Sequence, residues 1–194
     1  MDIKEKIINS AIEVIEAVGM NKVTTRKIAE KAGVNVAAVN YYFGSQKKLI
    51  QLALEKTLDN AFKDSIEEFD PAYSLEEALK KILLEWFEGS LNYPNITKAH
   101  FFEPFVNNSY KTVAVRRLNL FFKNLHKLIM DNYTGIDEDK LKLALSQLFG
   151  SLFSAILFPE LMKPYSGINY FREEDRAIYI ETLLARYIDK NRLK

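Results

Sequence analysis

The chain has 194 residues, and 48% of them are apolar, a proportion that supports a buried core and excludes wholesale disorder. It contains no cysteine, which excludes disulfides, thiolate nucleophiles and cysteine metal sites. The net charge is +1, yet residues 1–50 carry eight Lys and Arg against five Asp and Glu. The N-terminus lacks a signal-peptide core and the longest apolar stretch, residues 148–158, is too short to span a bilayer. We therefore expect a cytoplasmic protein without a membrane partner.

Helical periodicity dominates the first third of the chain. Apolar residues recur at helical spacing up to Gly19, where glycine can close the helix. Thr24 or Thr25 can cap a second helix that ends at Gly33, and Ser45 can cap a fourth. The predicted helices after the first span residues 26–32, 36–42 and 46 to about 69.

The remaining sequence predicts five further helices. Ser74 and Glu77 form a capping-box pattern for a helix that ends near Asn92. Pro94 suits the first turn of the next helix, which Pro104 should kink or end. The last three helices are predicted over residues 109–132, 137–158 and 172–190. The fold class is therefore all-α, with about nine helices.

The segment from Thr24 to Leu49, TTRKIAEKAGVNVAAVNYYFGSQKKL, carries the functional signal. Two short helices are joined by a tight A-G-V-N turn, in which Gly33 reverses the chain. Ile28 and Val39 point into one small core, and Ala29 is small where the helices must cross. These are the requirements of a helix-turn-helix, whose second helix enters the major groove of DNA.

This segment resembles the DNA-binding domain of the TetR/AcrR family of transcriptional regulators. The family pattern has a threonine-rich cap, I-A-x-x-A-G-V, a short recognition helix, an aromatic pair ending in Phe, and Ser-Lys-x-x-Leu. The resemblance covers residues 1 to about 60, and the rest agrees only in length and helical pattern. It implies a DNA-binding domain at residues 1–60 and a larger helical ligand-binding and dimerisation domain at 61–194. The matching residues are Thr24, Thr25, Ile28, Ala29, Ala32, Gly33, Val34, Tyr41, Tyr42, Phe43, Ser45 and Leu49.

The resemblance also implies a role for each matching position. Thr25 and Arg26 would contact phosphates at a helix N-terminus. The recognition helix would meet base edges, and two tyrosines after it would contact the backbone and sugars. Either of two lysines would anchor a flanking phosphate. The positions concerned are Val36, Ala37, Ala38 and Asn40 for the bases, Tyr41 and Tyr42 for the backbone, and Lys47 or Lys48 for the anchor.

Two positions depart from the family pattern. Gln46 stands where the family usually has lysine, which removes or displaces a backbone-anchoring charge. Asn40 stands where tyrosine is frequent. It could contact adenine in a bidentate manner, or only phosphate or solvent. Tyr41 and Tyr42 could also be interhelical core, and partial burial is expected for one of them.

Aromatic residues are dense between residues 75 and 133, and an aromatic cavity between helices is a common small-molecule site. Ordinary helical core is the alternative for any single residue. As a group they predict a largely apolar ligand, with Trp86, Phe101, Phe105, Tyr110 and Phe122 as the candidate contacts. His100 and Glu103 are too few for a metal site, so no metal or other cofactor is expected.

The last two helices are the candidate dimer interface. The helix over residues 137–158 is apolar over much of its circumference, and Ser146, Gly150 and Ser154 form a small-residue row on it. One interpretation is that these helices form a four-helix bundle with a second copy of the chain, as the resemblance also implies. The other interpretation is that their apolar surfaces are buried within one chain.

The leading hypothesis is a repressor, not an enzyme, that binds a palindromic operator in double-stranded DNA as a homodimer and is released by a small, largely apolar ligand. A helical small-molecule-binding or enzymatic protein with a purely structural N-terminal hairpin is a second hypothesis. Against it stand the specific head motif and the lack of catalytic motifs. A regulator that has lost DNA affinity is a third hypothesis, motivated by Gln46 and the small basic excess.

Overall fold

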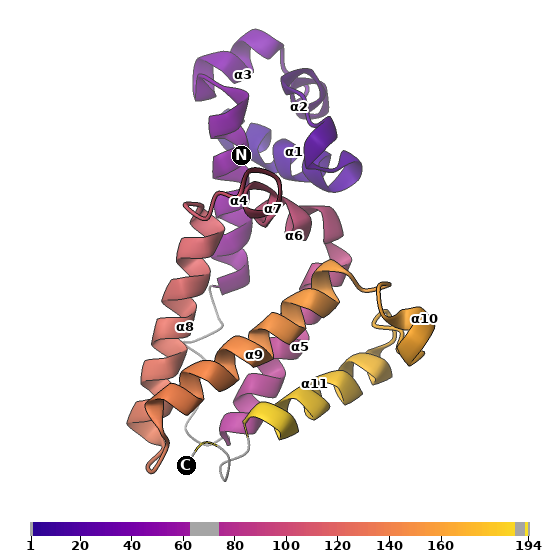
Figure 1. Cartoon of the computed structure of the whole chain (residues 1–194). Helices are drawn as coiled ribbons and strands as arrows, with labels where there is room; N and C mark the ends of the chain where they lie inside the picture. Colours follow the sequence, from indigo (N-terminus) through magenta and orange to yellow (C-terminus); the bar gives the residue numbers. More distant parts are fainter. Residues whose placement is uncertain (1, 63–73, 189–192, 194) are drawn as a thin grey trace. The chain divides into compact units, whose positions relative to one another are not determined.

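The computed structural model describes residues 2–62, 74–188 and 193. Its described residues are helical and include no strand, which confirms the all-α prediction. They form eleven α-helices and one short 3₁₀ helix. The expected parts of the long fourth helix beyond residue 62, and residues 189–190 of the last, lie outside the described residues. The chain divides into two compact units, residues 1–62 with 93–117 and residues 63–92 with 118–194 (Figure 1).

The first unit is built around a core shared by helices near the N-terminus (Figure 1). Ile7, Ile15, Ile28 and Leu49 are its largest fully buried side chains. Burial of such apolar side chains is the main force that holds short helices together. The elements are α1 (Ile3–Val18), η1 (Met20–Lys22), α2 (Thr25–Ala32), α3 (Val36–Phe43), α4 (Gln46–Phe62), α6 (Pro94–His100) and α7 (Phe102–Asn107).

Residues 93–117 belong to the first unit, whereas the sequence assigned everything after residue 60 to the second. Glu16 in α1 explains this placement, because its carboxylate accepts hydrogen bonds from the amides of Asn95 (3.4 Å) and Ile96 (2.9 Å). The side chains of Ile96 and Ala99 complete the N-terminal core. The start of α6 is thus capped by a residue far away in sequence.

Pro104 ends the preceding helix four residues before its own position. The helix ends at His100, Phe101 separates it from α7, and Pro104 lies inside α7. Proline has no N–H to donate to the carbonyl of His100, and its ring clashes with that carbonyl, so the helix cannot continue through this point. The predicted single helix is therefore two short ones, and the next helix begins at Val113 rather than near Ser109.

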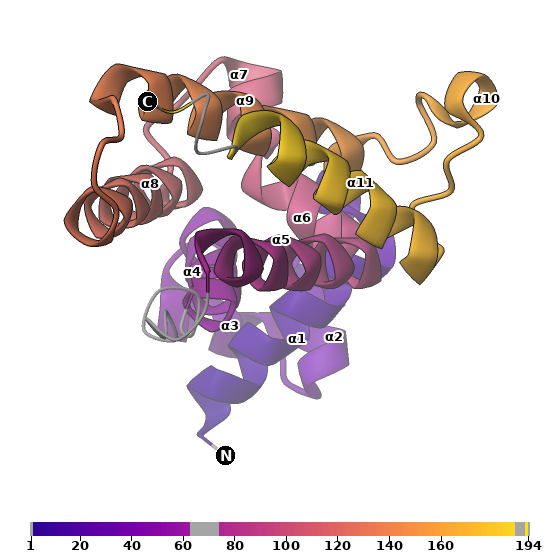
Figure 2. The same cartoon turned by 90° about the horizontal axis from the view of Figure 1, so that it is seen from below.

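The second unit packs three long helices side by side, α5, α9 and α11 (Figures 1 and 2). The capping box at Ser74 and Glu77 is confirmed, with the Glu77 carboxylate 2.8 Å from the amide of Ser74 and the Ser74 hydroxyl 3.2 Å from the amide of Glu77. Asp137 caps α9, because its side chain accepts a hydrogen bond from the amide of Lys140. The elements are α5 (Leu75–Asn92), α8 (Val113–Asn132, whose residues from 118 belong here), α9 (Glu138–Leu157), α10 (Lys163–Ser166) and α11 (Glu173–Tyr187).

Helix α9 is the only described helix with the length and mean hydropathy, 1.2, that a membrane span requires. Half of that apolar window is buried inside the protein. Its buried residues include Leu141, Leu148, Phe149 and Leu152, on the side that meets α5 and α11. Packing within the second unit accounts for the apolar composition of this side.

Candidate nucleic-acid interface

Helices α2 and α3 are set by local signals in the sequence. Thr24 caps α2, because its hydroxyl accepts a hydrogen bond from the amide of Lys27 at 3.2 Å. Gly33 ends α2 in the left-handed conformation, with φ of 64°. Asn35 then caps α3 through a 2.7 Å bond from the amide of Ala38. The tight turn between two capped helices is the helix-turn-helix that the sequence predicted.

Helix α3 has an inner and an outer side. Val39 and Phe43 are buried in the N-terminal core and hold the helix in place. The outer side carries small and polar groups together with one prominent aromatic ring, since Tyr41 is 84% exposed. The exposed residues of this side are Val36, Ala37, Asn40 and Tyr41.

Ala38 and Tyr42 lie at the edge between these two sides, and both are half-buried. Tyr42 packs against the N-terminal core, and its ring meets that of Tyr41 edge to face, with centroids 5.2 Å apart. One of the two tyrosines is therefore partly core and the other is free to face a partner. This division is the partial burial that the sequence predicted for one of them.

Gln46 connects α4 to the start of α2, a role that the sequence did not predict. Its side-chain oxygen accepts a hydrogen bond from the Thr25 hydroxyl at 3.2 Å, and its amide donates to the Val23 carbonyl at 3.0 Å. A carboxamide can accept and donate at once, whereas a lysine could only donate. The glutamine therefore fixes α2 in place. The Thr25 hydroxyl, expected at a phosphate, donates to Gln46 in the unbound protein.

The candidate phosphate-binding cations lie on different surfaces. Arg26 and Lys48 are exposed, on the first turns of α2 and α4. Lys47 is also exposed, but it lines a pocket of the first unit. The shift of 100° between adjacent helical positions explains why Lys47 and Lys48 face different ways.

The five candidate ligand contacts are divided between the two units. Trp86 and Phe122 are in the second unit, and both rings meet Phe149, with centroid distances of 5.8 and 4.9 Å. Phe101, Phe105 and Tyr110 are in the first unit. Phe105 and Tyr110 are 63% and 61% exposed there. The structure therefore brings together only Trp86 and Phe122 of the predicted set.

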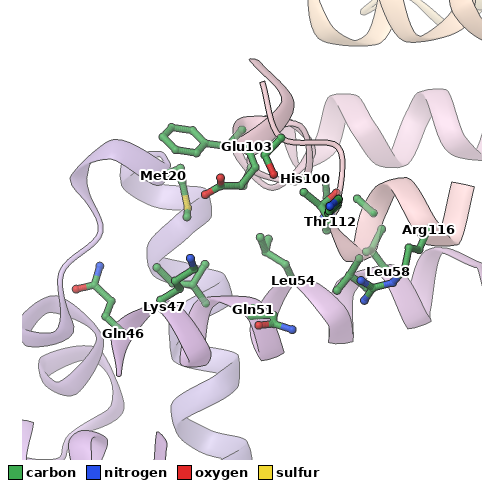
Figure 3. Close-up of a pocket in the computed structure, with 17 residues that line it drawn as sticks. Met20, Gln46, Lys47, Gln51, Leu54, Leu58, His100, Glu103, Thr112 and Arg116 are labelled. Atoms are coloured by element: carbon green, nitrogen blue, oxygen red, sulfur yellow. The ribbon is translucent and has the colours of Figure 1, made fainter. Parts of the chain in front are cut away.

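A pocket of about 600 Å³ in the first unit contains none of these five residues. Figure 3 shows Met20, Lys47 and Glu103 toward one end, Arg116 and Leu58 toward the other, and Leu54 between them. The apolar spacing of α4 in the sequence does not distinguish residues that border this pocket, such as Leu54, from core residues.

His100 lies beside this pocket and is held by α4. Its Nε2 is 3.1 Å from the hydroxyl of Thr57, which itself donates to the Leu54 carbonyl at 2.9 Å. Burial lowers the pKa of His100 to about 4, so the imidazole is neutral at pH 7. His100 and Glu103 belong to α6 and α7, and both line the pocket.

Comparison with known proteins agrees with this geometry. The family model described as bacterial regulatory proteins, tetR family, matches residues 7–53. The HTH-type transcriptional dual regulator CecR of Shigella flexneri is 24% identical, over 93% of this chain and 87% of CecR. The solved structure of the fatty acid degradation regulator FadR from Bacillus halodurans is similar with a TM-score of 0.71 and 18% identity, over 100% of this chain and 98% of FadR. FadR from Bacillus subtilis, solved in complex with stearoyl-CoA, has a TM-score of 0.58 and 16% identity, over 95% and 97%.

A capped helix-turn-helix with one side of its second helix exposed defines a DNA-binding protein. Residues 7–53 resemble the helix-turn-helix domain of the TetR family of bacterial regulatory proteins. It is a transcriptional regulator rather than an enzyme.

Proposed function

We propose that this regulator is a repressor that binds a palindromic operator as a homodimer and leaves it when a small, largely apolar ligand binds. TetR-family regulators bind DNA and small-molecule ligands and act as dimers. The observation that carries the proposal is the two-sided α3, which is fixed in the core by Val39 and Phe43 while Asn40 and Tyr41 stay exposed.

The contacts with DNA follow from the two sides of α3. Ala37 lets the backbone come close to the base edges, and Asn40 can pair with adenine in the major groove. Tyr41 and Tyr42 contact sugars and phosphates beside the major groove. The amides of Thr25 and Arg26 have no partner within α2, so they are suited to a phosphate. Val36 and Ala38 complete the base contacts, and Lys48 binds a flanking phosphate together with Lys47.

The dimer forms through α9 and α11. Ser146, Gly150 and Ser154 are all exposed on α9, and a Cβ atom added at Gly150 would meet nothing within 4 Å. Leu143 on α9 and Ile178 on α11 are both 60% exposed. Packing within the described part of the chain leaves this small-residue row uncovered. A second copy of the chain can approach closely here and bury Leu143 and Ile178.

The second unit supplies an apolar environment for the ligand. Trp86, Phe121, Phe122 and Phe149 stack on one another, with Trp86 and Phe121 centroids 4.6 Å apart. The structurally similar FadR of Bacillus subtilis was solved with stearoyl-CoA, a molecule with a long apolar chain. Both facts favour an apolar ligand, which reaches the regulator in the cytoplasm.

Release from DNA depends on the distance between two recognition helices. In a dimer they must lie about 34–36 Å apart to meet successive major grooves. A ligand that binds better to the dimer with another spacing lowers the population that fits DNA. CecR is named a dual regulator, so activation at some promoters is the alternative outcome for this chain.

The test is binding of the full chain to a labelled duplex from directly upstream of its own coding region, at two salt concentrations. A scrambled duplex of the same composition is the control. We expect tight, selective binding that weakens as salt rises, because bound phosphates release counterions. Absence of binding to either duplex at low salt would contradict the proposal and favour a regulator without DNA affinity. Reporter expression from the same promoter, higher without the regulator, distinguishes repression from activation.

A further inference from the structure

The pocket of the first unit has an apolar floor. Ile50 and Leu58 of α4, with Ala99 of α6 and Ala114 of α8, are buried beneath it. Its volume of about 600 Å³ lies within the range of small-molecule sites. All of its lining residues belong to residues 1–62 and 93–117, so the aromatic cluster of the second unit takes no part in it.

The rim of this pocket is positively charged. Lys47, Lys111 and Arg116 line it, and Glu103 is its one acidic residue. None of the three cations forms an ion pair among the residues that the structure describes. Glu103, in contrast, accepts a hydrogen bond from Asn107 at 2.9 Å. An anion at this rim would therefore meet cations that have no competing carboxylate partner.

His100 adds a polar group at the pocket wall. Because the Thr57 hydroxyl donates to the Leu54 carbonyl, it can only accept from Nε2 of His100, which places the ring proton there. Nδ1 is then an acceptor, and it is buried with no hydrogen-bond partner among the described residues. Nδ1 has almost no accessible surface, so this atom takes no part in the ligand site.

We propose that this pocket binds an amphipathic organic anion, with an acidic head group at Arg116 and Lys111 and an apolar body over Leu58 and Leu54 (Figure 3). The ligand site does not rest on the proposed function.

The binding test uses two fluorescent probes with nearly the same hydrocarbon body. The first is 1-anilinonaphthalene-8-sulfonate, which carries one negative charge and one N–H, and the second is N-phenyl-1-naphthylamine, which lacks the sulfonate. Arg116→Gln removes a rim cation, and Arg117→Gln is the matched control, because Arg117 does not line the pocket. Both arginines are exposed, so both variants should fold.

We expect Arg116→Gln to raise the Kd of the sulfonate about tenfold, the effect of losing one charge-assisted contact. Arg117→Gln should leave this Kd unchanged, and neither variant should alter the Kd of the uncharged probe. Equal sulfonate binding by the two variants would overturn the site. Lys111→Gln provides a second variant with the same expected result.

DNA binding is measured separately, with the upstream duplex. If the protein binds the sulfonate at Arg116 but binds no DNA, the proposed function fails while the ligand site stands.

Discussion

The two units use aromatic side chains in opposite ways. In the first unit α3 holds Tyr41 outward, 84% exposed, beside a half-buried Tyr42. In the second unit Phe121 and Phe149 are buried and stack with Trp86. An exposed ring contributes little to the stability of its fold, whereas a buried ring packed against other rings stabilises it. Tyr41 therefore stays available to a partner of the first unit, whereas Phe121 and Phe149 belong to the packed interior of the second.

The largest expected effect concerns this packed interior. Phe149→Ala should lower the free energy of unfolding by about 3–5 kcal/mol, because it removes a buried ring and leaves a cavity. Phe171→Ala is the control, because Phe171 is an exposed ring of the same unit. Chemical denaturation at fixed protein concentration measures both. A loss below about 1 kcal/mol for Phe149→Ala would mean that the cluster is an open pocket rather than core.

The second prediction concerns buried His100 in the first unit. Burial lowers its folded-state pKa to about 4 from an ordinary value of 6.5, so only the unfolded chain takes up this proton between those pH values. Its contribution to stability is present above pH 6.5 and is lost as the pH falls toward 4, by about 3 kcal/mol. Urea unfolding between pH 7 and 4 measures this. In His100→Gln the unfolding free energy should fall much less steeply with decreasing pH between pH 6.5 and 4. An unchanged pH dependence would assign the effect to other groups.

Comparison of the two units also shows which parts of the fold and of the candidate sites could be predicted from the sequence. The helix-turn-helix was predictable because its signals are local: Thr24 and Asn35 cap helices within three residues, and Gly33 takes up its turn conformation by itself. The packing of residues 93–117 with the first unit was not predictable, because it depends on Glu16, almost eighty residues earlier. The pocket was missed for the same reason, since α4, α6, α7 and α8 each supply part of it.

The third prediction tests the exposed side of the second unit. Gly150→Arg places a long cation in the small-residue row of α9, where it has room in one chain but not against a partner helix. The dimer dissociation constant should rise about 100-fold, since an unpaired charge would be buried. Sedimentation velocity over a concentration series measures it.

Gly89→Arg is the matched control, because Gly89 is also an exposed helical glycine with no atom near an added Cβ. Equal effects of the two substitutions, or none from Gly150→Arg, would place the interface elsewhere.

The smallest expected effect concerns Gln46. Gln46→Lys keeps a donor for the Val23 carbonyl but loses the bond from Thr25, and we expect a loss of about 1 kcal/mol in unfolding free energy. Gln51→Lys is the control, because Gln51 is bonded only to Glu55 on the same helix. DNA affinity should show no gain. Tighter binding by Gln46→Lys would instead support a regulator that has lost a phosphate contact.

The most direct test of the account is whether the exposed side of α3 reads DNA. Tyr41→Ala and Tyr165→Ala each remove a highly exposed tyrosine, 84% and 88% exposed, from the first and the second unit. Their affinities for the upstream duplex and its scrambled control should be measured at one salt concentration. We predict that Tyr41→Ala weakens selective binding about tenfold while Tyr165→Ala matches the wild type. Wild-type affinity in Tyr41→Ala would contradict the assignment of α3 as the recognition helix.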